Sequence, residues 1–302
     1  MKKHLRLILL FVALMITVLF TREIIGATPE STSLPEFEAK MFSQSAEYER
    51  FMGQWSRLLA PLHITFTGVK DGDRVLDVGA GTGALASTLE ASMPSSQIVG
   101  IDPSAGFIAY GKKNAKSDRL RFDIGDAQLL PYPVASFDKV MAQLVMNFIP
   151  DHNKALGEMR RVTRPNGVVS SCVWDYNAGM EMLRFFWDEV IALDPAMDKK
   201  DERHMKLSRE GQLGDLWRSA GLINVQEKPL VITQAFASFD DYWAPFLKGA
   251  GPGGAYVVSL THDRRSDLEA RLRKRLLGNR EDGPFMLKAR AWCVRGETPK
   301  TR

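Results

Sequence analysis

The sequence predicts an α/β protein built on one seven-stranded sheet with helices on both faces. From residue 74 onward, short apolar runs rich in β-branched residues alternate with helix-like segments, which is typical of parallel strands joined by right-handed crossovers. The first run ends in a glycine-rich stretch with Gly79, Gly81 and Gly83, the place where such sheets bind nucleotides. The expected strands cover 74–78, 97–101, 120–124, 137–143, 167–174, 223–233 and 285–294.

Helices are expected between these strands. The segment 84–93 follows the glycines, and 104–116 begins with the start signals Pro103 and Ser104. The segment 151–162 ends at a turn rich in proline and glycine, and 214–221 forms another helix. Ahead of the sheet, apolar and aromatic residues in 42–61 fall near one face and predict a helix that ends at Pro61.

Two further segments lie outside this alternation. The segment 185–204 is helix-like and ends in a run of charges at 198–203, which is expected to be solvated. The segment 236–280 is inserted between the last two strands and predicts a helical lid. Its last part is basic, with Leu268, Leu272 and Leu276 in one stripe, as in an amphipathic helix docked on the domain. The glycines in 249–254 are expected to act as a hinge.

The composition fits one large domain. The chain has 302 residues, 45% of them hydrophobic, and we expect a single domain over 35–302 with its core at 70–175 and its lid at 236–280. A net charge of +4 does not demand nucleic acid as a partner. The two cysteines, Cys172 and Cys293, lie in apolar strands and are expected to be buried free thiols, and no spacing typical of a metal site is present.

The first 34 residues differ from the rest. Basic residues precede the mostly apolar stretch 7–20, a pattern typical of a signal peptide and short for a membrane span. Three interpretations stay open: a true anchor or signal, a start codon placed too early with Met41 as the real start, or a peripheral tail that associates with membranes through 5–20. We expect a cytoplasmic protein, with membrane anchoring as the alternative.

Acidic residues at the strand ends indicate which ligand the glycine loop takes. The loop also fits the dinucleotide pattern G-x-G-x-x-G/A, but Asp77 just before it would repel a pyrophosphate and attract a cation. Asp102 ends the second strand about twenty residues further on, where a ribose diol is gripped. A third acid, Asp126, follows the third strand together with the small Ala127, a pair suited to meet adenine.

These three motifs resemble those of the class I S-adenosylmethionine-dependent methyltransferases, which have a Rossmann-like fold. The resemblance is to the small-molecule branch with the type 11 methyltransferase domain, which includes ubiquinone/menaquinone C-methyltransferase-like enzymes. It covers about 70–175 of this sequence, and more weakly 42–61 and 236–254. It implies a sheet whose last strand is antiparallel and lies between strands five and six.

The resemblance also implies roles for single residues, with S-adenosylmethionine as the cofactor. Asp77 would orient the ammonium group through a backbone turn or a water molecule, and Asp102 would hold the ribose hydroxyls. Gln143, at the end of the fourth strand, would face the methyl group. The remaining cofactor-binding residues are expected in the glycine loop and at the adenine: Gly79, Ala80, Gly81, Gly83, Asp126 and Ala127.

The acceptor is expected to be a small molecule held under the lid. Tyr242 and Trp243 are the candidates for lining its pocket, because the segment around them is rich in aromatic residues. No catalytic base can be chosen; the candidates are His152, Tyr176, His204, Asp240, Asp241 and Tyr242. The alternatives are a nicotinamide-dependent oxidoreductase and a non-catalytic accessory protein that binds S-adenosylmethionine.

Overall fold

The structure, a computed structural model, describes residues 49–249 and 251–300. The strands agree closely with the expected ranges and lengthen mainly near the end of the chain. They are β1 (Arg74–Val78), β2 (Gln97–Asp102), β3 (Leu120–Ile124), β4 (Phe137–Gln143), β5 (Thr163–Trp174), β6 (Ile223–Phe236) and β7 (Phe285–Glu297).

Helices separate these strands as the alternating pattern predicts, and short helical turns complete the chain. The α-helices are α3 (Gln54–Thr67), α4 (Ala84–Ser92), α5 (Ala105–Asn114), α6 (His152–Val162), α7 (Glu181–Leu193), α8 (Gln212–Ser219), α9 (Phe239–Leu247), α10 (Gly251–Ser259) and α11 (His262–Leu277). The short elements are the π-helical turn η1 (Glu49–Gly53) and the 3-10 turns η2 (Met146–Phe148), η3 (Pro195–Lys200) and η4 (Glu202–His204).

The seven strands form one sheet in the order β3-β2-β1-β4-β5-β7-β6. Strands β1 to β5 pair in parallel, and β7 lies antiparallel between β5 and β6, which confirms the expected topology. Successive residues of a strand face opposite sides. Val75 of β1 belongs to a buried cluster that includes residues of α3, α4 and α5, whereas its neighbour Leu76 belongs to a second cluster that includes residues of α6 and α8.

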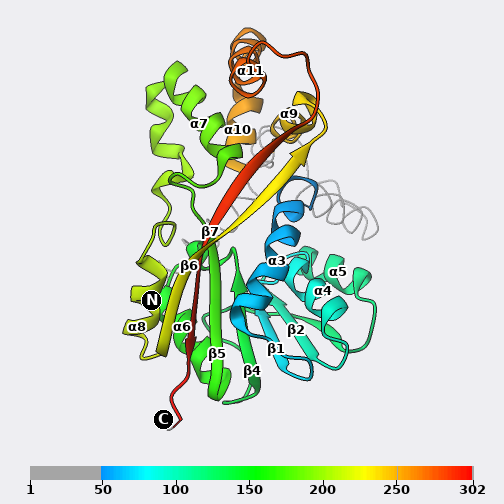
Figure 1. The fold of residues 1–302 in the computed structure, drawn as a ribbon, viewed down its shortest axis with the longest axis vertical. Helices are drawn as coiled ribbons and strands as arrows, with labels where there is room; N and C mark the ends of the chain where they lie inside the picture. Colours follow the sequence, from blue (N-terminus) through cyan, green and yellow to red (C-terminus); the bar gives the residue numbers. More distant parts are fainter. Residues whose placement is uncertain (1–48, 250, 301–302) are drawn as a thin grey trace, which may run out of the picture.

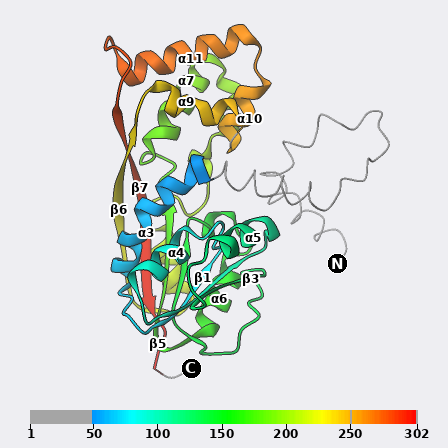
Figure 2. The ribbon, with the colours of Figure 1, turned by 90° about the vertical axis from the view of Figure 1, so that its right-hand side faces the viewer.

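Strands β6 and β7 continue well beyond the rest of the sheet and carry the helices of the lid (Figure 1). Helices α7, α9, α10 and α11 gather at the far end of this hairpin, which makes the molecule elongated (Figure 2). A cluster of aromatic rings fills this end: Phe186 and Phe246 stack at 4.5 Å between centroids, and Phe51 of η1 meets Phe246 edge-on at 5.6 Å. The inserted segment is therefore helical as expected, with Leu268 and Leu272 fully buried.

Two of the glycines expected to form a hinge serve close packing, and the hinge role of 249–254 stays a prediction. Gly253 and Gly254 lie inside α10. A Cβ on Gly253 would lie 2.9 Å from Cε1 of Phe186, and one on Gly254 would lie 2.5 Å from the backbone of Gly249. Because a larger residue would push α10 away from its neighbours, these glycines fix the position of the helix.

Helix α3 does not end at Pro61 as expected. It continues through this proline to Thr67, where Gly68 takes a left-handed conformation (φ 71°) and caps the end. Proline removes one backbone donor, and burial of Ile64, Phe66 and Thr67 against the sheet keeps the helix going beyond it. The part of the expected helix before residue 49 lies outside the described residues, as do the predictions for 1–34 and Met41.

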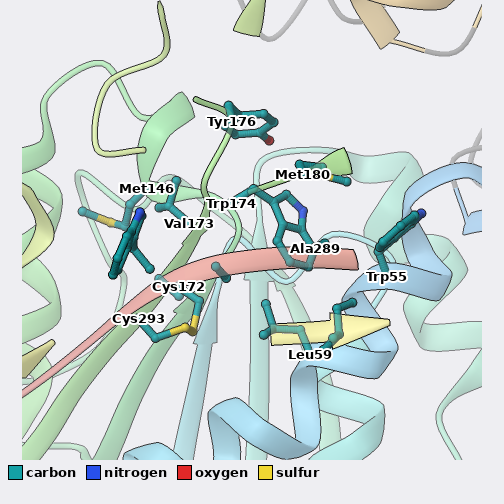
Figure 3. Packing of buried hydrophobic residues seen from close by; sticks show 14 of the residues in the cluster. Trp55, Leu59, Met146, Cys172, Val173, Trp174, Tyr176, Met180, Ala289 and Cys293 are labelled. Carbon is teal, nitrogen blue, oxygen red and sulfur yellow. A yellow bond between two sulfur atoms is a disulfide. The ribbon is translucent and has the colours of Figure 1, made fainter. Parts of the chain in front are cut away.

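The expectation of two free thiols is wrong in this structure, because Cys172 and Cys293 form a disulfide. The two residues are direct partners in the antiparallel pairing of β5 with β7, and both are fully buried (Figure 3). Directly opposed residues of antiparallel strands bring their Cβ atoms within reach of such a bond. The pairing of these two strands was implied only by the resemblance, so the cysteine spacing alone gave no signal.

The expectation that the charges at 198–203 are solvated is also wrong in part. Asp201 is 3% exposed and accepts hydrogen bonds from the guanidinium groups of Arg184 and Arg203. Glu202 is 7% exposed, and its Oε2 finds no hydrogen-bond partner among the described residues. The run folds back on α7 because Arg184, itself buried, needs a carboxylate to balance its charge.

Candidate active site

The glycine loop takes the shape that its sequence predicts. Gly79, Gly81 and Gly83 all have positive φ, at 70°, 55° and 94°. A Cβ on Gly79 would collide with the side chain of Val145, and one on Gly83 would lie 2.8 Å from Cζ of Phe122. Gly81 differs, since a Cβ there would meet no described atom within 4 Å. The middle of the loop therefore faces open space, where a ligand can approach the backbone.

Asp102 fixes the shape of this loop from the next strand. Its Oδ2 accepts the N–H of Gly81 at 3.0 Å, and its Oδ1 accepts the N–H of Ser104 at 2.9 Å. Asp102 is 8% exposed, and burial raises the pKa of its carboxyl group. Each oxygen keeps a second lone pair, so the carboxylate can still accept hydrogen bonds from a pair of hydroxyl groups.

Asp77 is buried near the end of β1. It is 1% exposed, and its Oδ2 accepts the N–H of Ala86 in the first turn of α4 at 3.1 Å. Burial raises the pKa of Asp77 to about 7. Its influence on a ligand would pass through the loop backbone, so the expected orienting role stays a prediction.

The third motif joins the other two at the same edge of the sheet. The N–H of Gly125 donates to the carbonyl oxygen of Asp102 at 3.1 Å. Asp126 is exposed and accepts the N–H of Gln128 at 2.8 Å, while Ala127 is half-buried against the core. The carboxyl ends of β1, β2 and β3 thus bring together the loop, Asp102, Asp126 and Ala127, with Ala80 buried beneath the loop.

Gln143 points from the end of β4 toward α3. Its Nε2 donates to the carbonyl oxygen of Ser56 at 3.0 Å, and its Oε1 lies 3.4 Å from Nδ1 of His63. His63 is fully buried, and its Nε2 lies 2.9 Å from Oγ of Ser170 on β5. Burial lowers the pKa of His63 to about 4, so the imidazole is neutral near pH 7. The predicted contact of Gln143 with a methyl group stays a prediction.

The backbone just after Gln143 is strained. Leu144 has a φ of 63°, which is rare for a large side chain, and its N–H donates to the carbonyl oxygen of Cys172 at 2.8 Å. Such outliers concentrate at functional sites. Polar atoms without partners follow within a few residues, because neither Oδ1 of Asn147 nor Nε2 of His152 has a hydrogen-bond partner in the described part of the chain.

The two residues expected to line the acceptor pocket lie in the aromatic cluster of the lid. Tyr242 is 1% exposed and donates its hydroxyl to the carbonyl oxygen of Met182 at 3.1 Å. Trp243 is 2% exposed and lies between Phe239 and Phe246. Both side chains therefore have clear packing roles, and their contact with an acceptor stays a prediction.

The other base candidates are scattered. His204 pairs with Asp198 on the surface, and Asp240 pairs with Arg273. Asp241 accepts the N–H of Ala237. Tyr176 is buried near the end of β5 beside Trp174 and Met180 (Figure 3). In residues 49–249 and 251–300, no group of three His, Cys, Asp or Glu side chains is placed to hold a metal ion.

One acidic residue at the site was missed by the sequence motifs. Glu49 of η1 is 7% exposed and accepts a hydrogen bond from the hydroxyl group of Thr82 in the glycine loop. It lies far from the motifs in sequence, and no fixed spacing links it to them. Gly53, four residues later, lacks a side chain that would lie 2.5 Å from Cδ of Glu49, but a glycine by itself does not indicate such an acid.

Comparisons with known proteins agree with this geometry. A family model described as a methyltransferase domain matches residues 69–216. Demethylmenaquinone methyltransferase of Geobacillus kaustophilus is 30% identical over 176 residues, which cover 53% of this chain and 75% of that protein. The enzyme of the same name from Deinococcus radiodurans is 44% identical over 96 residues, 31% of this chain and 40% of that protein.

Solved structures share the fold at low sequence identity. The YcgJ protein of Bacillus subtilis superposes with a TM-score of 0.53 at 20% identity, over 80% of this chain and 97% of that one. Phosphoethanolamine N-methyltransferase 2 of Haemonchus contortus, solved with phosphomonomethylethanolamine and S-adenosylhomocysteine, gives a TM-score of 0.53 at 18% identity, over 90% of this chain and 61% of that one.

The sheet order, the loop with its acids and the relative aligned over three quarters of its length all lead to one assignment. The chain belongs to the class I S-adenosylmethionine-dependent methyltransferases, the family in which S-adenosylmethionine is the methyl donor.

Proposed function

We propose that this protein transfers a methyl group from S-adenosylmethionine to a small-molecule acceptor. The observation that carries the proposal is the contact between Asp102 and the N–H of Gly81, which shapes an open glycine loop beside a carboxylate. The residues fit the cofactor: backbone without side chains for the methionine part, and two carboxylate oxygens for a ribose diol.

The residues of the chain orient the cofactor and the acceptor rather than supply an acid or a base. Bound S-adenosylmethionine would supply a methyl group on a sulfonium, whose positive charge already activates the leaving group. The protein must hold the acceptor in line with this group and exclude water. The glycine loop and Asp102 orient the cofactor, and α3 packs beside the carboxyl ends of the strands, where Ser56 and His63 contact Gln143.

The acceptor is proposed to be an apolar, aromatic small molecule such as a quinol. Support comes from the names of the two curated relatives, both demethylmenaquinone methyltransferases. The alignments cover 40% and 75% of those proteins, and the family model stops at residue 216, before the lid begins. Because the lid helices lie outside the matched family domain, the acceptor has to be established for this chain separately.

A labelling experiment tests the proposal. The full chain is incubated with methyl-labelled S-adenosylmethionine and, in separate reactions, demethylmenaquinol or a metabolite extract, and the products are separated by chromatography. We expect a labelled small molecule that is absent with Gly81→Val, because a β-branched side chain at φ 55° both strains the loop and fills the open space. Calorimetry that detects NADH binding but no S-adenosylmethionine binding would reject the proposal.

The protein is proposed to work in the cytoplasm, where S-adenosylmethionine is made. We also propose that 35–302 forms one catalytic domain. Contact of 5–20 with the membrane is the alternative for the location. No helix in the described part of the chain is long and apolar enough to cross a membrane. The Cys172–Cys293 disulfide favours an oxidising compartment rather than the cytoplasm, because such bonds persist mainly in oxidising compartments. Fractionation of cells, followed by protease treatment of intact and lysed fractions, distinguishes the two locations.

A further inference from the structure

An ion pair lies against the cofactor loop and belongs to none of the sequence motifs. It joins Glu49 in η1 to Arg57 in α3. The Glu49 carboxylate also accepts a hydrogen bond from the hydroxyl group of Thr82, the fourth residue of the glycine loop. The pair therefore brings one negative and one positive charge from the start of α3 to the loop that would hold the methionine part of the cofactor.

The surroundings of Glu49 are built to keep its carboxylate in this place. The Glu49 side chain is 8% exposed, and Thr82 is 7% exposed. A Cβ on Gly53 would lie 2.5 Å from Cδ of Glu49, so a larger residue there would displace the carboxylate from its present position. Arg57 is 51% exposed, which leaves its guanidinium group free to turn toward a new partner without unpacking α3.

Two of the acids that the motifs supply already have backbone partners, and Asp102 is expected to serve the ribose. Asp77 is buried and bonded to the N–H of Ala86, and both oxygens of Asp102 accept backbone N–H groups. The methionine end of S-adenosylmethionine carries an ammonium and a carboxylate group. Glu49 reaches this loop from η1, the turn just before α3, and contacts it through Thr82.

We propose that Glu49 and Arg57 bind the amino-acid end of S-adenosylmethionine, with Glu49 accepting from its ammonium group and Arg57 donating to its carboxylate. This inference rests on the proposed function, since it assumes that the loop binds S-adenosylmethionine. The exchange leaves each charge with an opposite charge beside it, so no ion is buried alone. It also ties the start of α3 to the cofactor, which would hold this helix over the loop while the cofactor is bound.

Two ligands separate this role from a structural one. S-adenosylmethionine has the amino-acid group, and 5′-methylthioadenosine lacks it but keeps the adenine, ribose and sulfur. Dissociation constants for both are measured by calorimetry on the full chain and on Glu49→Gln and Arg57→Gln. We expect S-adenosylmethionine to bind at least tenfold more weakly to each variant, while the affinity for 5′-methylthioadenosine changes less than twofold.

The control is Glu227→Gln, which removes the charge of another glutamate that holds backbone N–H groups, those of Gly211 and Gly214, away from the loop. It should leave both affinities unchanged. Arg57→Gln keeps the test decisive if Glu49→Gln does not fold, because Arg57 is half-exposed.

Three results would overturn the inference. Tighter binding of S-adenosylmethionine by Glu49→Gln would show that Glu49 occupies the place of the cofactor carboxylate and competes with it. Equal weakening of both ligands would show that the pair only positions the loop, and unchanged affinities would show that it takes no part in binding. If the unmodified chain binds neither ligand, the proposed function itself fails, which is a different result from the other three.

Discussion

Glu202→Gln should change how the stability of the protein depends on pH. Glu202 is 7% exposed, and burial raises the pKa of its carboxyl group from 4.5 to about 7. The folded protein therefore keeps this proton up to about pH 7, whereas the unfolded chain releases it above pH 4.5. Because the folded state binds more protons in this window, the free energy of unfolding falls as the pH rises through it.

The size of the effect follows from the shift in pKa. Because each tenfold change in proton affinity is worth about 1.4 kcal/mol, a pKa of about 7 in place of 4.5 removes roughly 3 kcal/mol of stability by pH 8, most of it between pH 5 and 7. Glutamine has the same shape and does not ionise, so the variant should escape this loss. Urea unfolding at pH 5, 6, 7 and 8, followed by tryptophan fluorescence, gives the free energy of unfolding for both proteins.

The difference in the free energy of unfolding, variant minus unmodified protein, should rise by about 2–3 kcal/mol between pH 5 and pH 8. Glu281→Gln, a change at an exposed position, is the control and should follow the unmodified protein at every pH. Other groups, such as His63, titrate in both proteins, so their contributions to the free energy of unfolding cancel in the difference. If the curves for Glu202→Gln and the unmodified protein run parallel, Glu202 is charged in the folded state and the reasoning is refuted.

Three further predictions concern the cofactor, the lid and the disulfide. Asp102→Ala should weaken S-adenosylmethionine binding by about 2–3 kcal/mol, measured by calorimetry, because the loop and the ribose both lose a charged acceptor; unchanged affinity would remove Asp102 from the site. Trp243→Ala should lower the free energy of unfolding by about 3–5 kcal/mol, because the indole is 2% exposed among aromatic rings. If Trp243→Ala instead keeps its free energy of unfolding and loses turnover, Trp243 contacts the acceptor. Thiol titration in denaturant should detect no free thiol until a reductant is added, and Cys172→Ser should cost about 2–5 kcal/mol; two thiols without reductant would exclude the disulfide.

The parts of the fold that the sequence predicted well are those with local signals. Strand β1, the glycine loop and Asp102 have short patterns whose meaning depends on a few neighbours, and their geometry agrees with those patterns. The parts that failed depend on partners far away in the chain. Asp201 is buried because the chain folds back on α7, where Arg184 donates a hydrogen bond to it. The charge pattern around residue 201 does not indicate this partner.

The same reason explains what was missed or misplaced at the site. Glu49 reaches the loop from 33 positions earlier, and only the packing of η1 and α3 brings it there. The cysteines pair across 121 positions, which no spacing rule reveals without the strand order. The sequence predicts a helix end at Pro61, whereas α3 continues to Thr67, because local propensity cannot show how much apolar surface the following turn buries.

The long hairpin of β6 and β7 connects the lid to the sheet. Pairing of β5 with β7 ends at Trp174 and Ala291, whereas β6 and β7 stay paired as far as Phe236 and Phe285. The segment after β5 still holds β7 beyond this point, because Met180 bridges to Ala289. Past Ala289, β6 and β7 form a two-stranded arm, which twists more readily than a wide sheet. The Cys172–Cys293 bond ties β7 to β5 below this arm, so a lid that moved with the bond intact would move by bending of the arm past Ala289.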